Sequence, residues 1–215
     1  MTSGVASWDE YLRSFPKARF AAATGHLPER LVLALRTAVM LAPVIPFTNV
    51  VAPGVEVVAL NQAEVEQLNR EHSYRALDGD TKSALRDIFA NLKEPIANLL
   101  DSPWRVLNCR SWTTLKGASI GPNDWHLDGD HPGILKLMIY ATPTGGEYGG
   151  IEFLDARLNG EDWIVFYSSV VRLRGIAPSV EGLERVATEV TLCQSHDFYL
   201  EPRFLGLAAR KPKEP

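Results

Sequence analysis

The sequence predicts an α+β protein in which a mainly helical first half is followed by a strand-rich second half. Apolar residues recur at helical spacing through the first hundred residues. After residue 103, short runs rich in β-branched and aromatic residues follow one another closely. With 215 residues, 46% of them hydrophobic, the chain is long enough for one substantial core. We expect one domain, with a helical layer over residues 1–102, a strand core over 103–205 and a tail over 206–215.

Proline and capping residues bound the helices of the first half. Proline suits the first turn of a helix and cannot continue one, so Pro28 is expected to open a helix that stops before Pro43. Asp80 or Thr81 is expected to cap a longer helix that runs from Lys82 towards residue 100. The other elements expected here are helices over 7–22, with a break near Pro16, and over 64–70, and a strand over 55–60.

The second half contains apolar runs bounded by glycine, proline and aspartate, a pattern typical of strands. The expected strands cover residues 105–112, 124–128, 135–142, 151–154, 163–168 and 186–193. On the first of them Asn108, Arg110 and Trp112 alternate and therefore share one face. That face lines a cavity or contacts solvent, and the sequence favours neither arrangement.

Composition excludes several classes of function. The net charge of −4 and the pI of about 5.8 give no electrostatic basis for nucleic-acid binding. The apolar run of residues 31–47 contains Arg36 and two prolines, which argues against a membrane span. Cys109 and Cys193 are too few to imply a disulfide framework, so we expect reduced thiols in a cytoplasmic protein. No pattern indicates an oligomeric state.

The first chemical signal is the segment His126-Leu127-Asp128. Residues two apart on an extended backbone face the same way, so an imidazole nitrogen and a carboxylate oxygen can meet at one metal ion. Such a pair with open positions suits non-haem Fe(II), whereas a structural zinc site needs four ligands. Chance alone gives about a quarter of one such triplet in a chain of this composition, so the surrounding motifs must supply the specificity.

The order of the motifs that follow is more specific than any one of them. In chain order they are His126-Leu127-Asp128, the apolar run 134–142, the glycine pairs within 145–150, Arg174-Gly175-Ile176-Ala177-Pro178 and Glu184-Arg185-Val186. This order resembles that of the Fe(II)/2-oxoglutarate-dependent oxygenases, in particular the phytanoyl-CoA and prolyl hydroxylase-like branches, over about residues 104–193. The resemblance implies a double-stranded β-helix core, a cupin-like jelly roll, with the N-terminal helices packed on one face.

The same resemblance implies a dioxygenase that uses Fe(II) and 2-oxoglutarate to hydroxylate or otherwise oxidise a small-molecule substrate. His126 and Asp128 match the first two metal ligands of the family. Arg185 matches the cation that binds the far carboxylate of 2-oxoglutarate, a role that suits a planar guanidinium with paired donors. Lys136 and Tyr140 lie where the family often places a polar group that touches 2-oxoglutarate.

The chain departs from the family at the last metal ligand. The family places a second histidine directly before the Arg-Gly pair, and this sequence has Leu173 there. The nominees for a replacement ligand are His196, His131, Asp130 and Glu189, of which we favour His196. A variant takes His196 as the true ligand and Arg203 as the anchor, but it abandons the match at residues 174–178.

Two further interpretations remain open. A site with two protein ligands holds Fe(II) weakly, and 2-oxoglutarate adds two oxygen ligands of its own. Alternatively, the chain is a degenerate family member that acts as a non-oxidative enzyme or a ligand-binding protein, because fold alone does not decide function.

Overall fold

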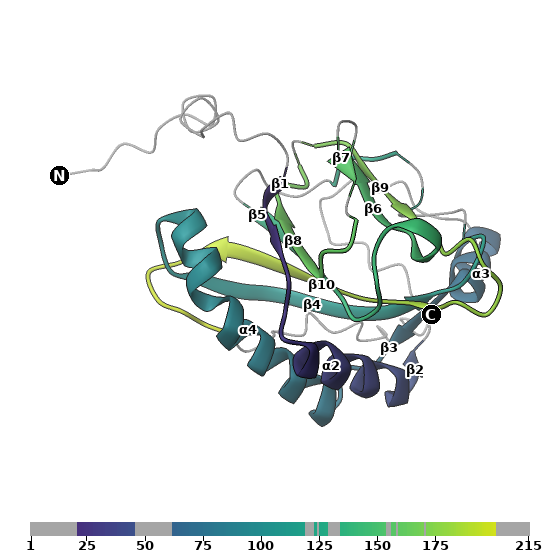
Figure 1. Cartoon of the computed structure of the whole chain (residues 1–215), viewed down its shortest axis with the longest axis horizontal. Coiled ribbons are helices and arrows are strands. Elements are labelled where there is room, and N and C mark those ends of the chain that lie inside the picture. Colours follow the sequence, from purple (N-terminus) through teal and green to yellow (C-terminus); the bar gives the residue numbers. More distant parts are fainter. Residues whose placement is uncertain are drawn as a thin grey trace, which may run out of the picture.

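The computed structural model describes residues 21–45, 62–118, 123, 125–128, 134–153, 156–157, 159–169 and 171–200. Two β-sheets lie one above the other, and helices cover the outer face of the larger sheet (Figure 1). This arrangement confirms the α+β prediction, and the two facing antiparallel sheets are those expected of a double-stranded β-helix core.

The larger sheet has seven strands, and every neighbouring pair in it is antiparallel. Their spatial order is β1 (Ala21–Gly25), β8 (Trp163–Phe166), β5 (Ile134–Tyr140), β10 (Arg185–Gln194), β4 (Trp104–Thr114), β3 (His72–Arg75) and β2 (Val44–Ile45). The smaller sheet has the order β7 (Ala156–Arg157), β6 (Gly150–Phe153) and β9 (Leu173–Ile176). The first hundred residues therefore supply three strands to the larger sheet as well as the expected helices.

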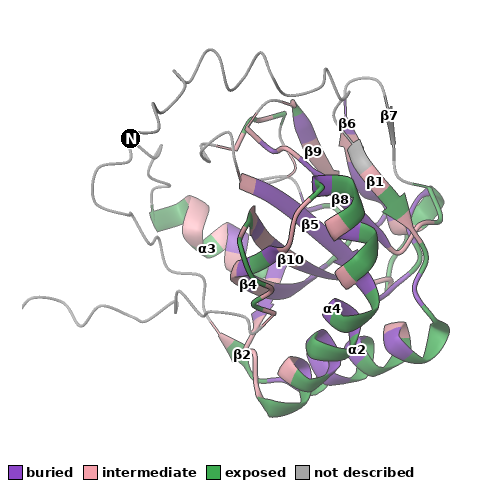
Figure 2. Cartoon of the chain, turned by 90° about the vertical axis from the view of Figure 1, so that its left-hand side faces the viewer, coloured by how far each residue is buried: buried purple, intermediate pink, exposed green. Residues whose placement is uncertain are grey.

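Each face of the larger sheet contributes to a different apolar cluster, because successive side chains of a strand point to opposite faces. On β10, Val186 and Val190 pack with α2 (Glu29–Leu41) and α4 (Gly79–Leu100). Ala187, between them, packs instead with residues of the smaller sheet. Figure 2 shows the buried residues concentrated on the strands and on the inner sides of these helices. The helices thus close one face, and the other face is left for the space between the sheets.

The helices of the first half were mostly predicted correctly. α2 ends before Pro43, α3 (Gln62–Glu71) covers the expected short helix, and α4 extends to Leu100 with Pro95 inside it. The predicted cap of α4 was wrong: Asp78, and neither Asp80 nor Thr81, is the cap, and its carboxylate accepts a hydrogen bond from Thr81 N–H at 2.9 Å. That hydrogen bond lowers the pKa of Asp78. None of the described helices combines the length and apolar character needed to cross a membrane.

Several predicted elements differ from the structure or cannot be compared with it. The expected strand at 124–128 is wrong for the described residues 125–128, of which only His126 pairs, in an isolated bridge with Leu173. Of the helix expected over 7–22, residues up to 20 lie outside the described residues, and the last two begin strand β1. The strand expected at 55–60 also lies outside them. Both cysteines carry free thiols, as expected.

The cap of α4 provides a stability test. We expect Asp78→Ala to lower the free energy of unfolding by about 1 kcal/mol at pH 7, because the Thr81 N–H loses its acceptor. Since the pKa of Asp78 is lowered in the folded state, this contribution is present above about pH 4 and is lost as the pH falls through the folded value. Urea unfolding at pH 7 measures the loss. Asp80→Ala is the control, with an expected loss of about 0.3 kcal/mol from the helix dipole, and equal losses would contradict the assignment.

A candidate active site between the two sheets

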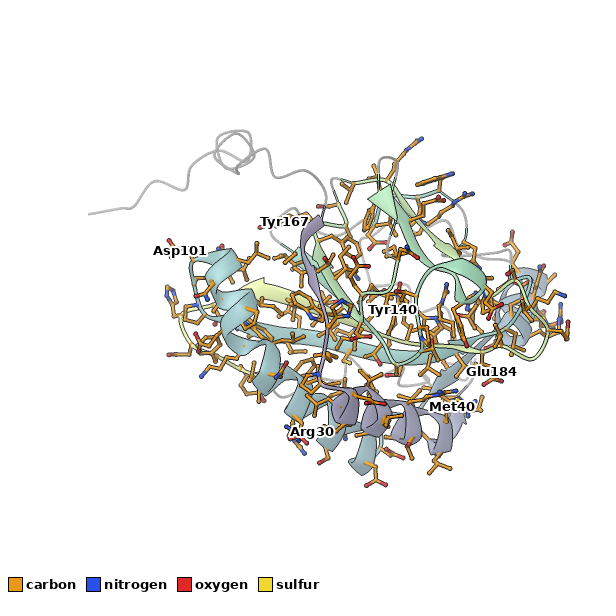
Figure 3. All side chains as sticks on the ribbon, in the orientation of Figure 1. Arg30, Met40, Asp101, Tyr140, Tyr167 and Glu184 are labelled. Atoms are coloured by element: carbon orange, nitrogen blue, oxygen red, sulfur yellow. The ribbon has the colours of Figure 1, made fainter. Side chains whose placement is uncertain are left out.

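A cavity of about 240 Å³ lies between the two sheets and is lined by residues of both. Four of the five site residues predicted from the sequence line it: His126, Asp128, Tyr140 and Arg185. The other lining residues are Leu68, Tyr74, Arg110, Trp112, Met138, Gly150, Ile151, Phe166, Leu173, Gly175 and Glu189. Tyr140, labelled in Figure 3, projects near the middle of the molecule, where side chains from both sheets converge.

His126 and Asp128 converge as their spacing predicts. The His126 Nε2 atom lies 3.5 Å from Asp128 Oδ1, and both side chains are partly exposed. Backbone hydrogen bonds hold the segment: His126 and Leu173 exchange both N–H to carbonyl bonds at 3.0 Å, and Asp128 N–H donates to the Ser168 carbonyl at 3.1 Å. The pair is therefore fixed between β9 and the turn that follows β8, although it lies outside any regular strand.

Leu173 is the residue directly opposite His126. In an antiparallel bridge the two side chains lie on the same face, so the leucine side chain is adjacent to the imidazole. Leu173 is 6% exposed and belongs to the apolar cluster between the sheets. Among the residues that the structure describes, no group of three or more His, Cys, Asp or Glu side chains is placed to hold a metal ion.

Neither of the two nominees that the structure describes, His196 and Glu189, completes the pair. His196 follows the far end of β10 and lines a separate hollow with Ser102 and Arg105. Glu189 is the cavity residue of β10 closest in sequence to that end, and it is five residues from Gln194, about 16 Å at about 3.3 Å per residue, so His196 lies outside the cavity. Two other nominees, His131 and Asp130, and the alternative anchor Arg203 lie outside the described residues.

Glu189, the remaining nominee, lines the cavity but is engaged by two cations. Its Oε2 accepts a hydrogen bond from Arg110 Nη2 at 2.7 Å, and its Oε1 accepts one from Lys136 Nζ at 2.9 Å. Burial alone would raise the pKa of Glu189, but Arg110 and Lys136 together lower it to about 2. The carboxylate is therefore ionised and neutralised within the protein. Lys136, predicted to touch 2-oxoglutarate, is bound in this network and does not line the cavity.

Arg185 is a buried cation whose hydrogen-bond partners include no carboxylate. It is 3% exposed, and its Nη1 donates to the carbonyls of Gly150, at 3.1 Å, and Ile176. Its Nη2 donates to Thr114 Oγ1 at 3.3 Å, and its Nε is buried without a partner in the described structure. Desolvation lowers the pKa of Arg185. Since burying an unpaired charge is costly, an anion beside this guanidinium would stabilise it.

Tyr140 adds a neutral donor to the same cavity. Burial raises the pKa of its phenol to about 12, and the nearby Arg185 opposes that shift. The hydroxyl therefore keeps its proton at neutral pH and can donate it to an acceptor in the cavity.

His72 and Thr114 support Arg185, and the sequence analysis missed both. His72 lies in β3, is 1% exposed and has its Nδ1 3.0 Å from Thr114 Oγ1. The register aligns His72 with Thr114 and Thr114 with Arg185 across three adjacent strands. A four-residue strand gives too short an alternation to be recognised in the sequence.

The glycine pairs within residues 145–150 form a tight turn. Gly145 N–H donates to the Gly149 carbonyl at 2.6 Å around a 3₁₀ turn, η2 (Gly146–Tyr148). Gly149 has φ +72°, and a Cβ there would clash with the Ile176 carbonyl. Glycine at this position therefore lets the turn approach one of the carbonyls that bind Arg185.

No protein-family model matches this sequence, and no curated protein matches it. Three solved structures show the same fold. The viral collagen prolyl hydroxylase vCPH from Paramecium Bursaria Chlorella virus-1, in complex with 2-oxoglutarate, has a TM-score of 0.51 at 13% identity over 85% of this chain and 99% of its own. The non-heme α-ketoglutarate-dependent epimerase SnoN from nogalamycin biosynthesis has a TM-score of 0.53 at 12% identity over 80% of this chain and 76% of its own. HygX from Streptomyces hygroscopicus, with nickel and 2-oxoglutarate bound, has a TM-score of 0.50 at 12% identity over 93% of this chain and 91% of its own.

The ion pairs of Glu189 give a stability prediction. We expect Glu189→Gln to lower the free energy of unfolding by about 2 kcal/mol at pH 7, because the nearly buried Lys136 loses its counter-ion, whereas the Arg110 side chain is 42% exposed and is partly hydrated. The folded pKa is lowered, so the carboxylate stabilises the fold above about pH 4 and this stabilisation is lost as the pH falls towards 2. The difference between variant and wild type in urea unfolding should shrink over that interval.

Glu181→Gln is the matched control for this prediction. Glu181 pairs with Lys116 at 3.4 Å on the surface, where the carboxylate is 89% exposed. The same substitution should therefore cost about 0.5 kcal/mol or less. Equal effects at the two glutamates would show that Glu189 is not a buried counter-ion.

Proposed function

We propose that this protein is a 2-oxoglutarate-dependent oxygenase that binds its cosubstrate at Arg185 and Fe(II) at His126 and Asp128, and that it oxidises a small-molecule substrate. The observation that carries the proposal is that the His126–Asp128 pair and the buried Arg185 guanidinium line one cavity. A prolyl hydroxylase in complex with 2-oxoglutarate, and HygX with nickel and 2-oxoglutarate bound, share the fold.

The cosubstrate end of the cavity fits a carboxylate. A guanidinium offers paired donors in a planar arrangement, and Arg185 has a buried Nε without a partner in the described structure. A carboxylate bound there would satisfy that donor and neutralise the buried charge. The Tyr140 phenol, which is neutral, lines the same cavity and can donate a further hydrogen bond.

The metal end supplies two of the three side chains of the family's usual triad. His126 and Asp128 offer one nitrogen and one oxygen, the ligand types that suit Fe(II), and Leu173 offers none. Positions not filled by protein fall to water or to 2-oxoglutarate. We therefore expect weak metal affinity in the absence of 2-oxoglutarate and stronger affinity in its presence.

When bound, the iron would supply the redox chemistry, in which O₂ and 2-oxoglutarate give succinate and CO₂ and one oxygen atom is available to oxidise the substrate. The protein's own residues bind and orient the reactants. Arg185 fixes the far carboxylate of the cosubstrate. The apolar side chains of Met138, Phe166 and Leu173 line the cavity away from Arg185 and limit water there.

The cosubstrate assignment is tested by Arg185→Met. We expect wild-type protein with Fe(II) to bind 2-oxoglutarate in anaerobic calorimetry and to release succinate in air. Arg185→Met should weaken binding about 100-fold or more, because a buried anion would lose its cation.

Arg174→Met is the matched control, since Arg174 pairs with Glu152 and lies over the Trp125 ring without lining the cavity. This control should bind 2-oxoglutarate as wild type does. Retention of full affinity by Arg185→Met, with its fold intact by circular dichroism, would refute the assignment of Arg185.

A second candidate function is a non-oxidative enzyme or ligand-binding protein on the same fold. The observation that favours it is Leu173, a buried apolar side chain beside the His126 imidazole where a ligand would complete the triad. This function predicts that 2-oxoglutarate or a similar dicarboxylate binds at Arg185 with the same affinity with or without Fe(II), and that no succinate forms in air.

Leu173→His distinguishes an incomplete metal site from a cavity unrelated to metal. Because residue 173 lies opposite His126, a histidine there is expected to raise Fe(II) affinity about tenfold or more, the order of one added ligand. The visible absorption band of Fe(II) with 2-oxoglutarate, followed in anaerobic titration, reports the gain. Leu127→His is the control, because Leu127 is half exposed and does not line the cavity. An equal gain in both variants would refute the alignment of Leu173 with the missing ligand.

A further inference from the structure

We propose that Arg110 and Trp112 form a second subsite in the cavity, which holds the substrate through a carboxylate or carboxamide group attached to a small apolar body. The inference rests on the proposed function in one respect: Arg185 is assigned to 2-oxoglutarate, and the substrate therefore needs another anchor. The subsite would define the chemical class of the substrate, which follows neither from the fold nor from the His126–Asp128 pair.

The position of the subsite follows from the strand register. Arg185 and Glu189 are four residues apart on the same face of β10, about 13 Å at about 3.3 Å per residue. Arg110 on β4 is paired with Glu189, and Thr114 is paired with Arg185. Arg110 and Arg185 thus stand at separate places along one wall, and both line the same cavity.

This part of the wall contains two buried donors without partners in the described structure. Trp112 is 6% exposed and its Nε1 has no acceptor. Arg110 uses Nη2 for Glu189, while its buried Nε has no acceptor. Buried donors normally find partners, so two of them beside one cavity indicate a ligand that presents acceptors.

The charges nearby favour the same ligand. Both Glu189 oxygens already accept hydrogen bonds, one from Arg110 and one from Lys136, so the carboxylate is not offered to a ligand amine. Asp128 is the other carboxylate that lines the cavity, and it acts electrostatically on Arg110, but the proposed function assigns it to Fe(II). With Asp128 bound to the metal, an ammonium group would meet Arg110 and Lys136 without another carboxylate to bind it, whereas a carboxylate or an amide carbonyl would complete the hydrogen bonding.

Aromatic and apolar side chains supply the rest of the subsite. The Tyr74 and Trp112 rings lie with centroids 6.0 Å apart, and Met138, Ile151 and Phe166 line the cavity with them. At about 240 Å³ the cavity is smaller than the 300–1,000 Å³ or so typical of ligand sites, and the cosubstrate takes part of it. The substrate is therefore small and has an apolar body about the size of one ring.

Three probes of nearly equal shape test the class of substrate: benzoate, benzamide and benzylamine. The protein is saturated anaerobically with Fe(II) and 2-oxoglutarate, so that Asp128 and Arg185 are both occupied, and the dissociation constants of the three probes are measured by calorimetry. We expect benzoate and benzamide to bind and benzylamine to bind at least about tenfold more weakly, the order of one hydrogen bond to a charged group. Benzylamine binding as tightly as benzoate would overturn the proposal.

Trp112→Phe and Trp163→Phe are the matched variants. Both tryptophans have a buried Nε1 without a partner in the described structure, but Trp163 does not line the cavity and packs in the cluster on the helix side. We expect Trp112→Phe to weaken benzoate binding about tenfold and Trp163→Phe to leave it unchanged. Equal effects of the two substitutions would overturn the proposal.

Two further results separate this proposal from the proposed function and from a folding defect. Arg110→Lys keeps the charge beside Glu189 and removes the Nε donor, so it should weaken benzoate as Trp112→Phe does; unchanged binding would count against the subsite. If 2-oxoglutarate fails to bind but benzoate affinity still depends on Trp112, the subsite stands and the proposed function falls. If 2-oxoglutarate binds and benzoate shows no such dependence, the subsite falls alone.

Discussion

The alternation of side chains along β10 is the constraint on which the cavity depends. Val186 and Val190 point towards the helices and join the apolar cluster beneath the larger sheet, so the strand is held firmly from one side. The alternate residues of β10 therefore face the smaller sheet. Arg185 and Glu189 are among them and lie along one wall of the cavity. A shift of one residue in register would put both charges into the helix-side core, where no partner exists for them among the clustered residues.

Glu189 and Arg185, the two charged residues of β10 on that wall, have different kinds of partner. We therefore expect one to stabilise the fold and the other to bind a ligand. Glu189 is neutralised internally by Arg110 and Lys136, so its contribution is to the fold. Within the part of the chain that the structure describes, Arg185 donates to carbonyl and hydroxyl acceptors, which orient the guanidinium without neutralising it. A protein that keeps a buried cation in this state gains stability from any anion that reaches it, and the cavity provides the route. The candidate anion site is therefore at Arg185.

The fold class, most of the helices and the His126–Asp128 pair could be predicted because each depends on a local pattern. The cap of α4 was a local failure, because Asp78 and Asp80 carry the same side chain and both lie at the start of the helix, so the sequence did not show which one reaches the Thr81 N–H. The other failures concern contacts between segments distant in sequence. The strand that contains His72 is defined by its pairing with β4. His196 was favoured as a ligand because sequence distance conceals the length of β10.

Because Leu173 cannot bind a metal, the two candidate functions predict different coupling between the binding of Fe(II) and the binding of 2-oxoglutarate. In a site where the protein supplies two metal ligands and 2-oxoglutarate supplies others, binding of the metal strengthens binding of the cosubstrate, and binding of the cosubstrate strengthens binding of the metal. The factor by which Fe(II) raises the affinity for 2-oxoglutarate must then equal the factor by which 2-oxoglutarate raises the affinity for Fe(II). A complete triad would hold metal by itself and reduce this dependence, and a cavity that binds only the anion at Arg185 would show a factor of one. The leucine beside His126 therefore makes the coupling between the two ligands, more than the affinity for either, the property that separates an oxygenase from a binding protein on this fold.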